Sequence, residues 1–454
     1  MYNKNSPESI ENFAKELIGS TFNDILPEDS KDYNGKGKLG QLVEKYHFRY
    51  NPNSNPNPDF PEAGVELKVT PYKKLKNGKL SAKERLVLNI IDFNKIVHED
   101  FFNSSFYHKN KLLLLIWYFH DILASNPLDY SIDYVKLFKY PEEDLKIITQ
   151  DWEKIVRKIR NGKAHELSEG DTMYLGACTK GSTAAKSMRK QPNSDILAPQ
   201  RAFSLKGSYM TSILRNYILN DIGTYESIVK DPSALEEYSF EEYVKSEIRK
   251  HRGRSLDELM TEFNINPKSK DRTSRVALKI LGVESKNASE FEKANIKVKA
   301  IRIEYNGKIK EHMSFPTFKF KDLVNESWEE SEFRTMLSET RFFFVIYKKD
   351  KNGNLILDKE MFWNMPIGIL DTEVKKVWKE AKQIIKDGVV LTQKGKRTFN
   401  NLPSPSENPV SHVRPHAQNS EDTYPLPDGR KMPKQCFWLN NSFILEQISL
   451  QEED

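Results

Sequence analysis

Apolar and polar positions along this chain follow two patterns, one typical of helices and one typical of strands. Apolar residues recur at helical spacing between Ser6-Pro7 and Gly19, which predicts a capped helix that ends at the glycine. The same spacing predicts a second helix over residues 39–46, which carries Glu44. Residues 51–58 are all Asn, Pro or Ser, so we expect a loop there.

Runs of apolar and β-branched residues predict strands after this loop. In the first half of the chain they lie at residues 65–70, 85–92 and 112–119, and the last is apolar enough to be a central strand. Helices are predicted at 141–165, 211–220 and within 239–263, and further β-like segments at 296–305, 342–347 and 434–445. Strands mixed with helices in both halves predict an α/β or α+β fold in each half.

The length predicts more than one domain. A chain of 454 residues exceeds one ordinary domain of about 150 residues, and we expect two. The first is predicted at residues 1–222 and the second at 241–454, with a linker at 223–240. A composition of 38% hydrophobic and 30% charged residues excludes a disordered chain.

Several classes of protein are excluded by simple features of the sequence. Cys178 and Cys436 are the only cysteines, too few for a disulfide framework or a multi-cysteine zinc site. The longest apolar run, at 112–119, is far too short to span a bilayer, and the N-terminus lacks the apolar core of a signal peptide. We therefore expect a cytoplasmic protein with no membrane partner.

The net charge of +5 only hints at a polyanionic partner, so local clustering carries more information. From Lys68 to Arg85 there are seven basic residues and one acidic residue.

Asp59, Glu66 and Lys68 form the constellation that carries chemistry. Glu66 and Lys68 stand two apart on a predicted strand and share one face, and Asp59 ends the preceding loop. Two carboxylates at a strand end suit Mg²⁺, which can activate a water, and the ammonium can orient that water or stabilise charge on a phosphate. By itself this spacing also fits a solvated strand face. The flanking Pro58 and Gly64 and the basic segment favour the site.

Three separated motifs carry a family resemblance. Residues 36–44 (KGKLGQLVE), 59–79 (DFPEAGVELKVTPYKKLKNGK) and 165–170 (HELSEG) resemble the signature of MutH and of the type II restriction endonucleases related to it. The resemblance implies a PD-(D/E)xK restriction-endonuclease-like fold, a mixed sheet flanked by helices. It also implies Mg²⁺-dependent hydrolysis of double-stranded DNA at GATC, 5′ of the G.

The resemblance also assigns roles to residues of the catalytic site. Asp59, Glu66 and Lys68 match the catalytic triad, and Glu44 matches an additional glutamate on the metal side. The remaining two matches are lysines of the active site, Lys36 and Lys109, with Lys111 as the alternative to Lys109.

DNA contacts are implied in two segments of the first half, 175–181 and 201–206. Lysine and hydroxyl donors suit the edges of bases in the major groove. The predicted contacts are Lys180, Arg201, Ser204 and Lys206. The family has an aromatic residue where this chain has Ser204, so a response to methylation is not implied.

The second half resembles a degenerate copy of the first. Residues 290–299 align without gaps on 59–68 and place Lys297 where Glu66 stands, and Leu278 takes the place of Glu44. A cation at the place of a metal ligand repels the ion, so we expect this half not to cut. It keeps DNA-facing parts in Arg414 and His416 and in a basic helix, whose lysines are Lys375, Lys376, Lys379, Lys382 and Lys386.

The resemblance implies that the second domain binds a second GATC copy as an allosteric effector, with dimerisation on DNA. Two alternatives stay open. One is a regulator that binds GATC without cutting, and the other is a methylation-directed repair nickase. Intact Glu66 and Lys68 favour an enzyme over the regulator, and the duplicated architecture favours cutting of both strands.

Overall fold

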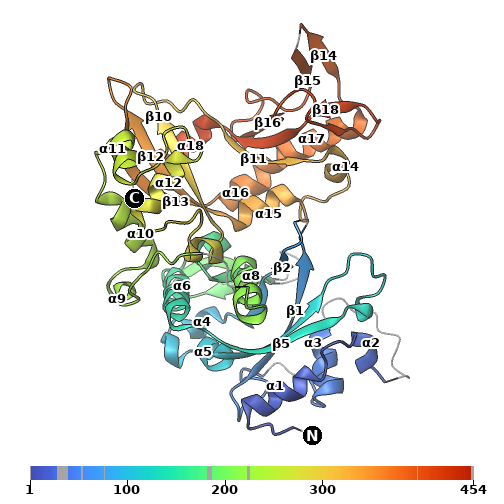
Figure 1. The fold of residues 1–454 in the computed structure, drawn as a ribbon. Coiled ribbons are helices and arrows are strands. Elements are labelled where there is room, and N and C mark those ends of the chain that lie inside the picture. Colours follow the sequence, from blue (N-terminus) through green and yellow to red (C-terminus); the bar gives the residue numbers. More distant parts are fainter. Residues whose placement is uncertain are drawn as a thin grey trace. The chain divides into compact units, whose positions relative to one another are not determined.

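The computed structural model describes residues 2–27, 39–52, 55–75, 77–180, 187–221, 225–395 and 397–450. Contacts divide the chain into two compact units, shown with their elements in Figure 1. The first unit comprises residues 1–243 and 287–295, and the second comprises 244–286 and 296–454. Within the described ranges, none of the helices has the length and apolar character needed to cross a membrane.

The first unit opens with the predicted helix. Helix α1 spans Pro7–Lys15, and the Ser6 side chain caps it by accepting a hydrogen bond from the Ser9 amide. The second predicted helix is also present, as α3 (Leu39–Leu42) followed by the π-helical turn η2 (Val43–His47). Both pack their apolar residues on one face of the main sheet, in a core that includes Leu67 and Ile116.

The main sheet of the first unit is mixed, with strand order β2-β1-β4-β5. Its strands are β1 (Glu66–Lys74), β2 (Leu80–Ala82), β4 (Leu112–Phe119) and β5 (Ile132–Lys139). Strands β1 and β4 run parallel with Glu66 opposite Leu113, whereas β2 and β5 are antiparallel to their neighbours. The prediction of a central strand at 112–119 is confirmed, because β4 lies between β1 and β5 and residues 113–117 are fully buried.

A second sheet of the first unit is antiparallel, with order β3-β9-β6. Its strands are β3 (Leu86–Ile90), β9 (Arg201–Leu205) and β6 (Leu175–Thr179). Helix α6 (Glu142–Arg160) holds the start of β6, because the buried Asp151 carboxylate accepts hydrogen bonds from three consecutive amides, residues 173–175. Helix α8 (Gly207–Ile213) continues into the π-helical turn η7 (Leu214–Ile218), where a helix was predicted.

The remaining elements of the first unit are short. They are α2 (Phe22–Ile25), α4 (Phe93–Ile96), η3 (Phe101–Asn103), α5 (Ser105–Asn110), η4 (Pro127–Asp129), η5 (Ala164–Glu166), η6 (Glu169–Asp171), β7 (Met188–Gln191), β8 (Ser194–Pro199), α9 (Ala234–Glu237) and α13 (Ser289–Lys293). Helix α10 (Phe240–Arg249) contains the passage to the second unit.

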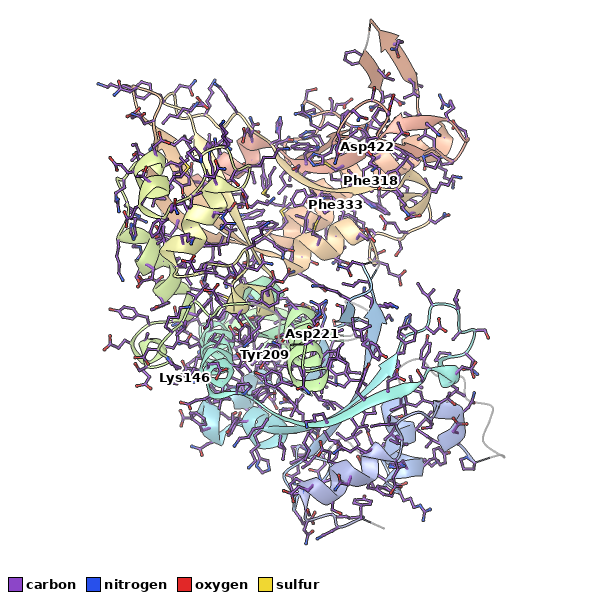
Figure 2. The ribbon with its side chains drawn as sticks, in the orientation of Figure 1. Lys146, Tyr209, Asp221, Phe318, Phe333 and Asp422 are labelled. Carbon is purple, nitrogen blue, oxygen red and sulfur yellow. The ribbon has the colours of Figure 1, made fainter. Side chains whose placement is uncertain are left out.

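Helix α13 belongs to the first unit although the chain enters the second unit directly after it. Its Lys293 ammonium lies 2.7 Å from the buried Asp144 carboxylate of α6. The same carboxylate accepts a hydrogen bond of 3.0 Å from the hydroxyl of Tyr209, which is labelled in Figure 2. Glu290 of α13 accepts hydrogen bonds from the amides of Ile228 and Val229. These buried polar contacts anchor α13 within the unit.

The second unit contains a mixed sheet and an antiparallel sheet. In the first, β10 (Ile296–Ile303) runs parallel to β12 (Arg341–Lys349), which pairs antiparallel with β13 (Leu355–Trp363). In the second, β19 (Gln435–Leu439) lies between β11 (Met313–Phe318) and β16 (Ser411–Pro415). The rings of Phe333 and Phe437 stack at 4.3 Å in the core beneath this sheet (Phe333 is labelled in Figure 2).

The other elements of the second unit are mostly helical. They are α11 (Leu256–Glu262), α12 (Arg272–Ile280), α14 (Phe320–Leu323), α15 (Glu332–Glu339), α16 (Ile367–Ile369), η8 (Leu370–Val374), α17 (Lys375–Asp387), β14 (Leu391–Lys394), β15 (Arg397–Asn400), β17 (Thr423–Pro425), β18 (Lys431–Pro433) and α18 (Asn441–Leu450).

The predicted β-segment at 434–445 is wrong in its second half. The strand ends at Leu439 and helix α18 follows. Phe443, Ile444 and Ile448 of α18 are buried at helical spacing, but a short apolar run looks the same in a strand and in a buried helix. The architecture of the chain is therefore mixed α/β with mixed sheets flanked by helices, as predicted.

Candidate active site

A tight turn brings Asp59 beside the first residues of β1. Phe60 and Val65 exchange two backbone hydrogen bonds, of 2.9 and 3.2 Å, and Gly64 closes the turn with a φ of 66°. The Leu67 amide donates to the Asp59 carboxylate at 3.0 Å, and the Asp59 amide donates to the Glu66 carboxylate at 3.1 Å. The positive φ favours glycine at this position, which explains its place before the strand.

Two lysines reach the Glu66 carboxylate, which is buried. The Lys68 Nζ lies 2.7 Å from Glu66 Oε1, as expected for residues two apart on one strand face. The Lys109 Nζ, from α5, lies 3.7 Å from the same oxygen and donates to the Asn55 carbonyl at 2.8 Å. Of the two lysines left open by the sequence, Lys109 is thus the one in contact with Glu66.

Glu44 joins this group from η2. Burial, followed by the charge of Asp59, raises the pKa of Glu44 to about 7. Burial and the charge of Glu66 raise the pKa of Asp59 to about 6. The negative charges of neighbouring carboxylates therefore raise the pKa values of Glu44 and Asp59. The structure brings together the predicted site residues Glu44, Asp59, Glu66, Lys68 and Lys109.

The carboxylates fit a hard divalent cation in their chemistry. Carboxylates that repel one another have raised pKa values, and a bound divalent cation would stabilise their ionised forms. Within the described ranges, no group of three His, Cys, Asp or Glu side chains stands in an arrangement that could hold a metal ion. At the predicted site this agrees with the engagement of Glu66 by Lys68 and of Asp59 by the Leu67 amide.

Tyr50 is a residue of the site that sequence reasoning missed. Its hydroxyl is buried without a hydrogen-bond partner among the described residues. Burial raises the pKa of the Tyr50 phenol, and the charges of Asp59 and Glu44 raise it further. The Tyr50 amide also donates to the Glu44 carbonyl at 3.1 Å, which ties Tyr50 to the turn that carries Glu44. The only available signal was an aromatic residue just after the helix that carries Glu44.

The predicted catalytic Lys36 lies outside the described residues. The four DNA-binding residues predicted in this unit lie on or beside β6 and β9. Lys180 follows β6 and is half-buried. Arg201 and Ser204 are 8% and 1% exposed, and Arg201 donates to the Ala177 carbonyl at 3.1 Å. Lys206 donates to the Thr172 carbonyl. Arg201, Ser204 and Lys206 thus have side chains that are either buried in the unit or hydrogen-bonded to its backbone, whereas Lys180 is only half-buried.

In the second unit, Arg414 and His416 are exposed and gather around one ring. The guanidinium of Arg414 lies 5.2 Å from the ring centre of Trp438, and the ring of His416 lies 5.4 Å from it. Lys297 and Lys299 stand at the positions predicted to be equivalent to Glu66 and Lys68. Burial and then the charge of Lys297 lower the pKa of Lys299.

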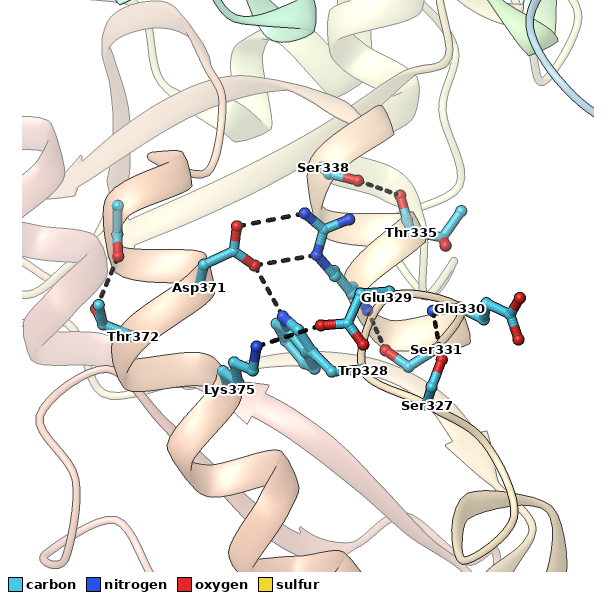
Figure 3. Close-up of polar contacts among 12 residues, drawn as sticks. Ser327, Trp328, Glu329, Glu330, Ser331, Thr335, Ser338, Asp371, Thr372 and Lys375 are labelled. Carbon is cyan, nitrogen blue, oxygen red and sulfur yellow. Dashed lines mark hydrogen bonds and ion pairs between the residues drawn. The ribbon is translucent and has the colours of Figure 1, made fainter. Parts of the chain in front are cut away.

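Figure 3 shows an acidic loop beside the start of the basic helix α17, where a glutamate of the loop pairs with a lysine of the helix. Lys375 lies 3.4 Å from the carboxylate of Glu329, and beside it the Asp371 carboxylate binds Arg334 and the indole of Trp328. Lys382 donates to the Glu326 carbonyl at 2.5 Å. Two of the five lysines predicted to face phosphate therefore have partners within the protein, and their contact with DNA stays a prediction. The exposed lysines of the helix are Lys376, Lys379 and Lys386.

Comparisons with known proteins show which family the chain resembles. The family model described as DNA mismatch repair enzyme MutH matches residues 48–151 and 281–375. The chain is 40% identical to the type II restriction enzyme Sau3AI of Staphylococcus aureus, over 97% of this chain and 98% of that protein. It is 29% identical to the DNA mismatch repair protein MutH of Shewanella woodyi, over 47% of this chain and 94% of that protein. It is also 26% identical to MutH of Vibrio campbellii, over 46% of this chain and 92% of that protein.

The 40% identity to the restriction enzyme covers nearly the whole of both chains, and the MutH family model also matches, so the family of this chain is established. The chain belongs to the type II restriction endonucleases related to MutH.

Proposed function

We propose that this protein is a type II restriction endonuclease that hydrolyses double-stranded DNA at GATC, 5′ of the G, with Mg²⁺ as cofactor. The observation that carries the proposal is the convergence of Asp59, Glu66 and Lys68 at the start of β1. Glu44 and Lys109 complete the site from two other elements. The near full-length relationship to a type II restriction enzyme supports the reaction class.

In the proposed reaction each residue has a separate role. Asp59, Glu66 and Glu44 would hold Mg²⁺, which supplies a Lewis acid for the charge that develops on the phosphate when it is bound. Lys68 would orient the attacking water near the phosphate. Lys109, which also contacts Glu66, would stabilise negative charge that develops in the site. Burial of Glu66 keeps these interactions strong, because a low dielectric screens them little.

The two predicted domains, 1–222 and 241–454, would be one fold used twice. In the structure, residues 223–243 and 287–295 belong to the first unit. The family model matches residues 48–151, which lie in the first unit, and 281–375, most of which lie in the second unit. Each unit has a parallel strand pair continued by an antiparallel strand, β1-β4-β5 and β10-β12-β13. Each also has a three-stranded antiparallel sheet. These parallels support a duplicated fold, with catalysis in the first copy only.

The second unit would bind a second GATC copy as an effector. The replacement of the catalytic glutamate by Lys297 removes a metal ligand, and buried Leu278 replaces Glu44. The exposed Arg414 and His416, arranged around Trp438, are suited to DNA contacts. One catalytic site per chain supports a homodimer on DNA, because cleavage of both strands of a palindrome by one complex needs two sites.

The central test uses purified full-length protein, Glu66→Ala and the control Glu62→Ala, an exposed glutamate close to the site in sequence. Plasmid DNA is supplied unmethylated, adenine-methylated or cytosine-methylated, with and without Mg²⁺. We expect Mg²⁺-dependent linear products from wild type and Glu62→Ala and none from Glu66→Ala. Cutting by Glu66→Ala, or no cutting by wild type, would contradict the enzymatic assignment, and nicked circles alone would indicate a repair nickase.

The effector role needs variants of the whole chain. A truncation at residue 222 would remove residues 287–295, which pack in the first unit. We therefore compare wild type with Arg414→Ala on plasmids that carry one or two GATC sites. We expect wild type to cut the two-site plasmid faster and Arg414→Ala to lose that advantage. Equal rates of wild type on both plasmids would contradict activation through a second site.

A further inference from the structure

Most of the basic residues between Lys68 and Arg85 have no role in the catalytic site. Lys68 is paired with Glu66, and Arg85 is paired with Glu169. The other described lysines of this segment are exposed, and no ion pair to them is found among the described residues. They are Lys73, Lys74, Lys79 and Lys83, which we call the hairpin lysines.

The hairpin lysines occupy the end of β1 that is remote from the catalytic residues. The hairpin is closed by a backbone hydrogen bond of 2.8 Å from the Leu75 amide to the Lys79 carbonyl, and Gly78 has a φ of 82°, as the Asn-Gly signal predicts. The two-residue period of a strand places Lys74 on the same face as Glu66 and Lys68. Eight residues at roughly 3.3 Å each separate Lys74 from Glu66, or about 26 Å.

An exposed apolar tip lies beside the hairpin. The His120 amide, directly after β4, donates to the Tyr72 carbonyl of β1 at 2.8 Å. The next turn presents Ile122 and Leu123, which are 84% and 88% exposed and exceed every other large apolar side chain in the described ranges. Asp121 stabilises the turn by accepting a hydrogen bond from the Leu123 amide at 2.9 Å.

The backbone contact between His120 and Tyr72 places the tip next to Lys73, the following residue of β1. Burial lowers the pKa of His120, and the charges of Lys83 and Lys73 lower it further, while Glu84 acts in the opposite direction. The tip therefore combines an exposed aliphatic pair with an excess of unpaired ammonium groups. That combination suits the DNA minor groove, where aliphatic side chains insert between base steps and nearby cations neutralise phosphates.

We propose that the hairpin lysines and the Ile122–Leu123 tip form an arm that binds duplex DNA flanking the recognition site. The lysines contact phosphates, and the tip enters the minor groove. The distance of about 26 Å from the catalytic residues corresponds to roughly seven or eight base pairs at 3.4 Å per base pair. This inference rests on the proposed function and extends it to DNA outside GATC.

The test measures affinity for duplexes of 12 and 40 base pairs that carry one central GATC, in the absence of divalent metal. Three full-length proteins are compared: wild type, a variant in which the four hairpin lysines are replaced by Gln, and a control that removes the same charge from exposed sites elsewhere in the first unit. The control substitutions are Lys4→Gln, Lys95→Gln, Lys139→Gln and Lys163→Gln.

We expect wild type and the control to bind the long duplex more tightly than the short one, and the hairpin variant to lose this advantage. Four phosphate contacts also predict that the affinity of wild type for the long duplex falls about 100-fold more between 50 and 200 mM salt than that of the hairpin variant. An unchanged length advantage or an unchanged salt slope in the hairpin variant would overturn the proposal.

The tip is tested with Ile122→Ser/Leu123→Ser, because an exposed apolar pair can be replaced without loss of core packing. Energy transfer between dyes at the ends of the 40-base-pair duplex reports the bend that insertion causes. We expect wild type to bend the duplex and the tip variant to bend it less. Equal bending, or binding of the tip to vesicles of anionic lipid instead of flanking DNA, would overturn the role of the tip. Failure of wild type to prefer GATC on the short duplex would instead contradict the proposed function.

Discussion

Replacing Lys293 with Met would leave the Asp144 carboxylate buried without its cation. The side chains of Asp144 and Lys293 are 1% and 9% exposed, and their charged atoms lie 2.7 Å apart. Among the described residues, the Asp144 carboxylate accepts one further hydrogen bond, from the Tyr209 hydroxyl at 3.0 Å. Loss of one partner of such a buried pair costs about 3–5 kcal/mol, a large part of the 5–15 kcal/mol that stabilises a typical domain.

The cost depends on pH in a defined direction. Burial raises the pKa of Asp144, and the charge of Lys293 opposes this, so the pKa is higher still in Lys293→Met. A carboxyl with a raised pKa stabilises the fold while it is protonated, below its ordinary pKa of about 3.9, and this stability is lost as pH rises through the folded value. The variant should therefore be closest to wild type near pH 4.5 and furthest from it near pH 8.

Urea unfolding followed by circular dichroism at pH 4.5 and pH 8 measures the effect. Lys286→Met, which removes an exposed lysine seven residues earlier, should change the free energy of unfolding by no more than about 0.5 kcal/mol. Asp144→Asn/Lys293→Met should recover part of the loss, because no buried charge is left unpaired. A loss below about 1 kcal/mol at pH 8, or one independent of pH, would refute the reasoning.

Three further predictions concern the proposed catalytic site and β6. If Glu44 and Asp59 hold Mg²⁺ as proposed, both must be ionised to bind it, and their pKa values are about 7 and about 6. The affinity for Mg²⁺ should then fall as pH drops from 8 to 6, with proton release detectable by calorimetry at pH 6.5, and equal affinity at pH 6 and pH 8 would contradict this. Tyr50→Phe removes a buried, unpartnered hydroxyl and should leave the free energy of unfolding unchanged or raise it by about 1 kcal/mol, and a loss measured by denaturation would count against the geometry. Asp151→Ala leaves three buried amides unpaired and should cost about 3 kcal/mol or more, with faster hydrogen exchange at the start of β6; unaltered exchange there would show that the anchor is dispensable.

The strand that carries Glu66 and Lys68 illustrates what local sequence can predict. The alternation of a strand determines that Glu66 and Lys68 share a face, and Gly64 indicates the turn that returns Asp59 to them. Helix α1 was likewise predictable, because its cap, its spacing and its glycine stop are all local signals.

Contacts between distant segments were decided by packing. Lys109 rather than Lys111 reaches Glu66, and the Tyr50 hydroxyl is buried while its amide bonds to the Glu44 carbonyl. Packing also determined that Arg201 is enclosed between strands and that Lys375 faces an acidic loop. No local periodicity encodes these partners, since they depend on which segments the fold brings together.

The sequence by itself thus determined the chemical types and local directions of the side chains proposed to be catalytic, because backbone period and turn geometry act over a few residues. The tertiary structure alone decided which charges are buried, paired or exposed, because burial and ion pairing depend on neighbours far along the chain. The lysines illustrate the division. Their number is read from the sequence, but only the fold separates Lys68 and Lys109, which contact Glu66, from the hairpin lysines that remain exposed.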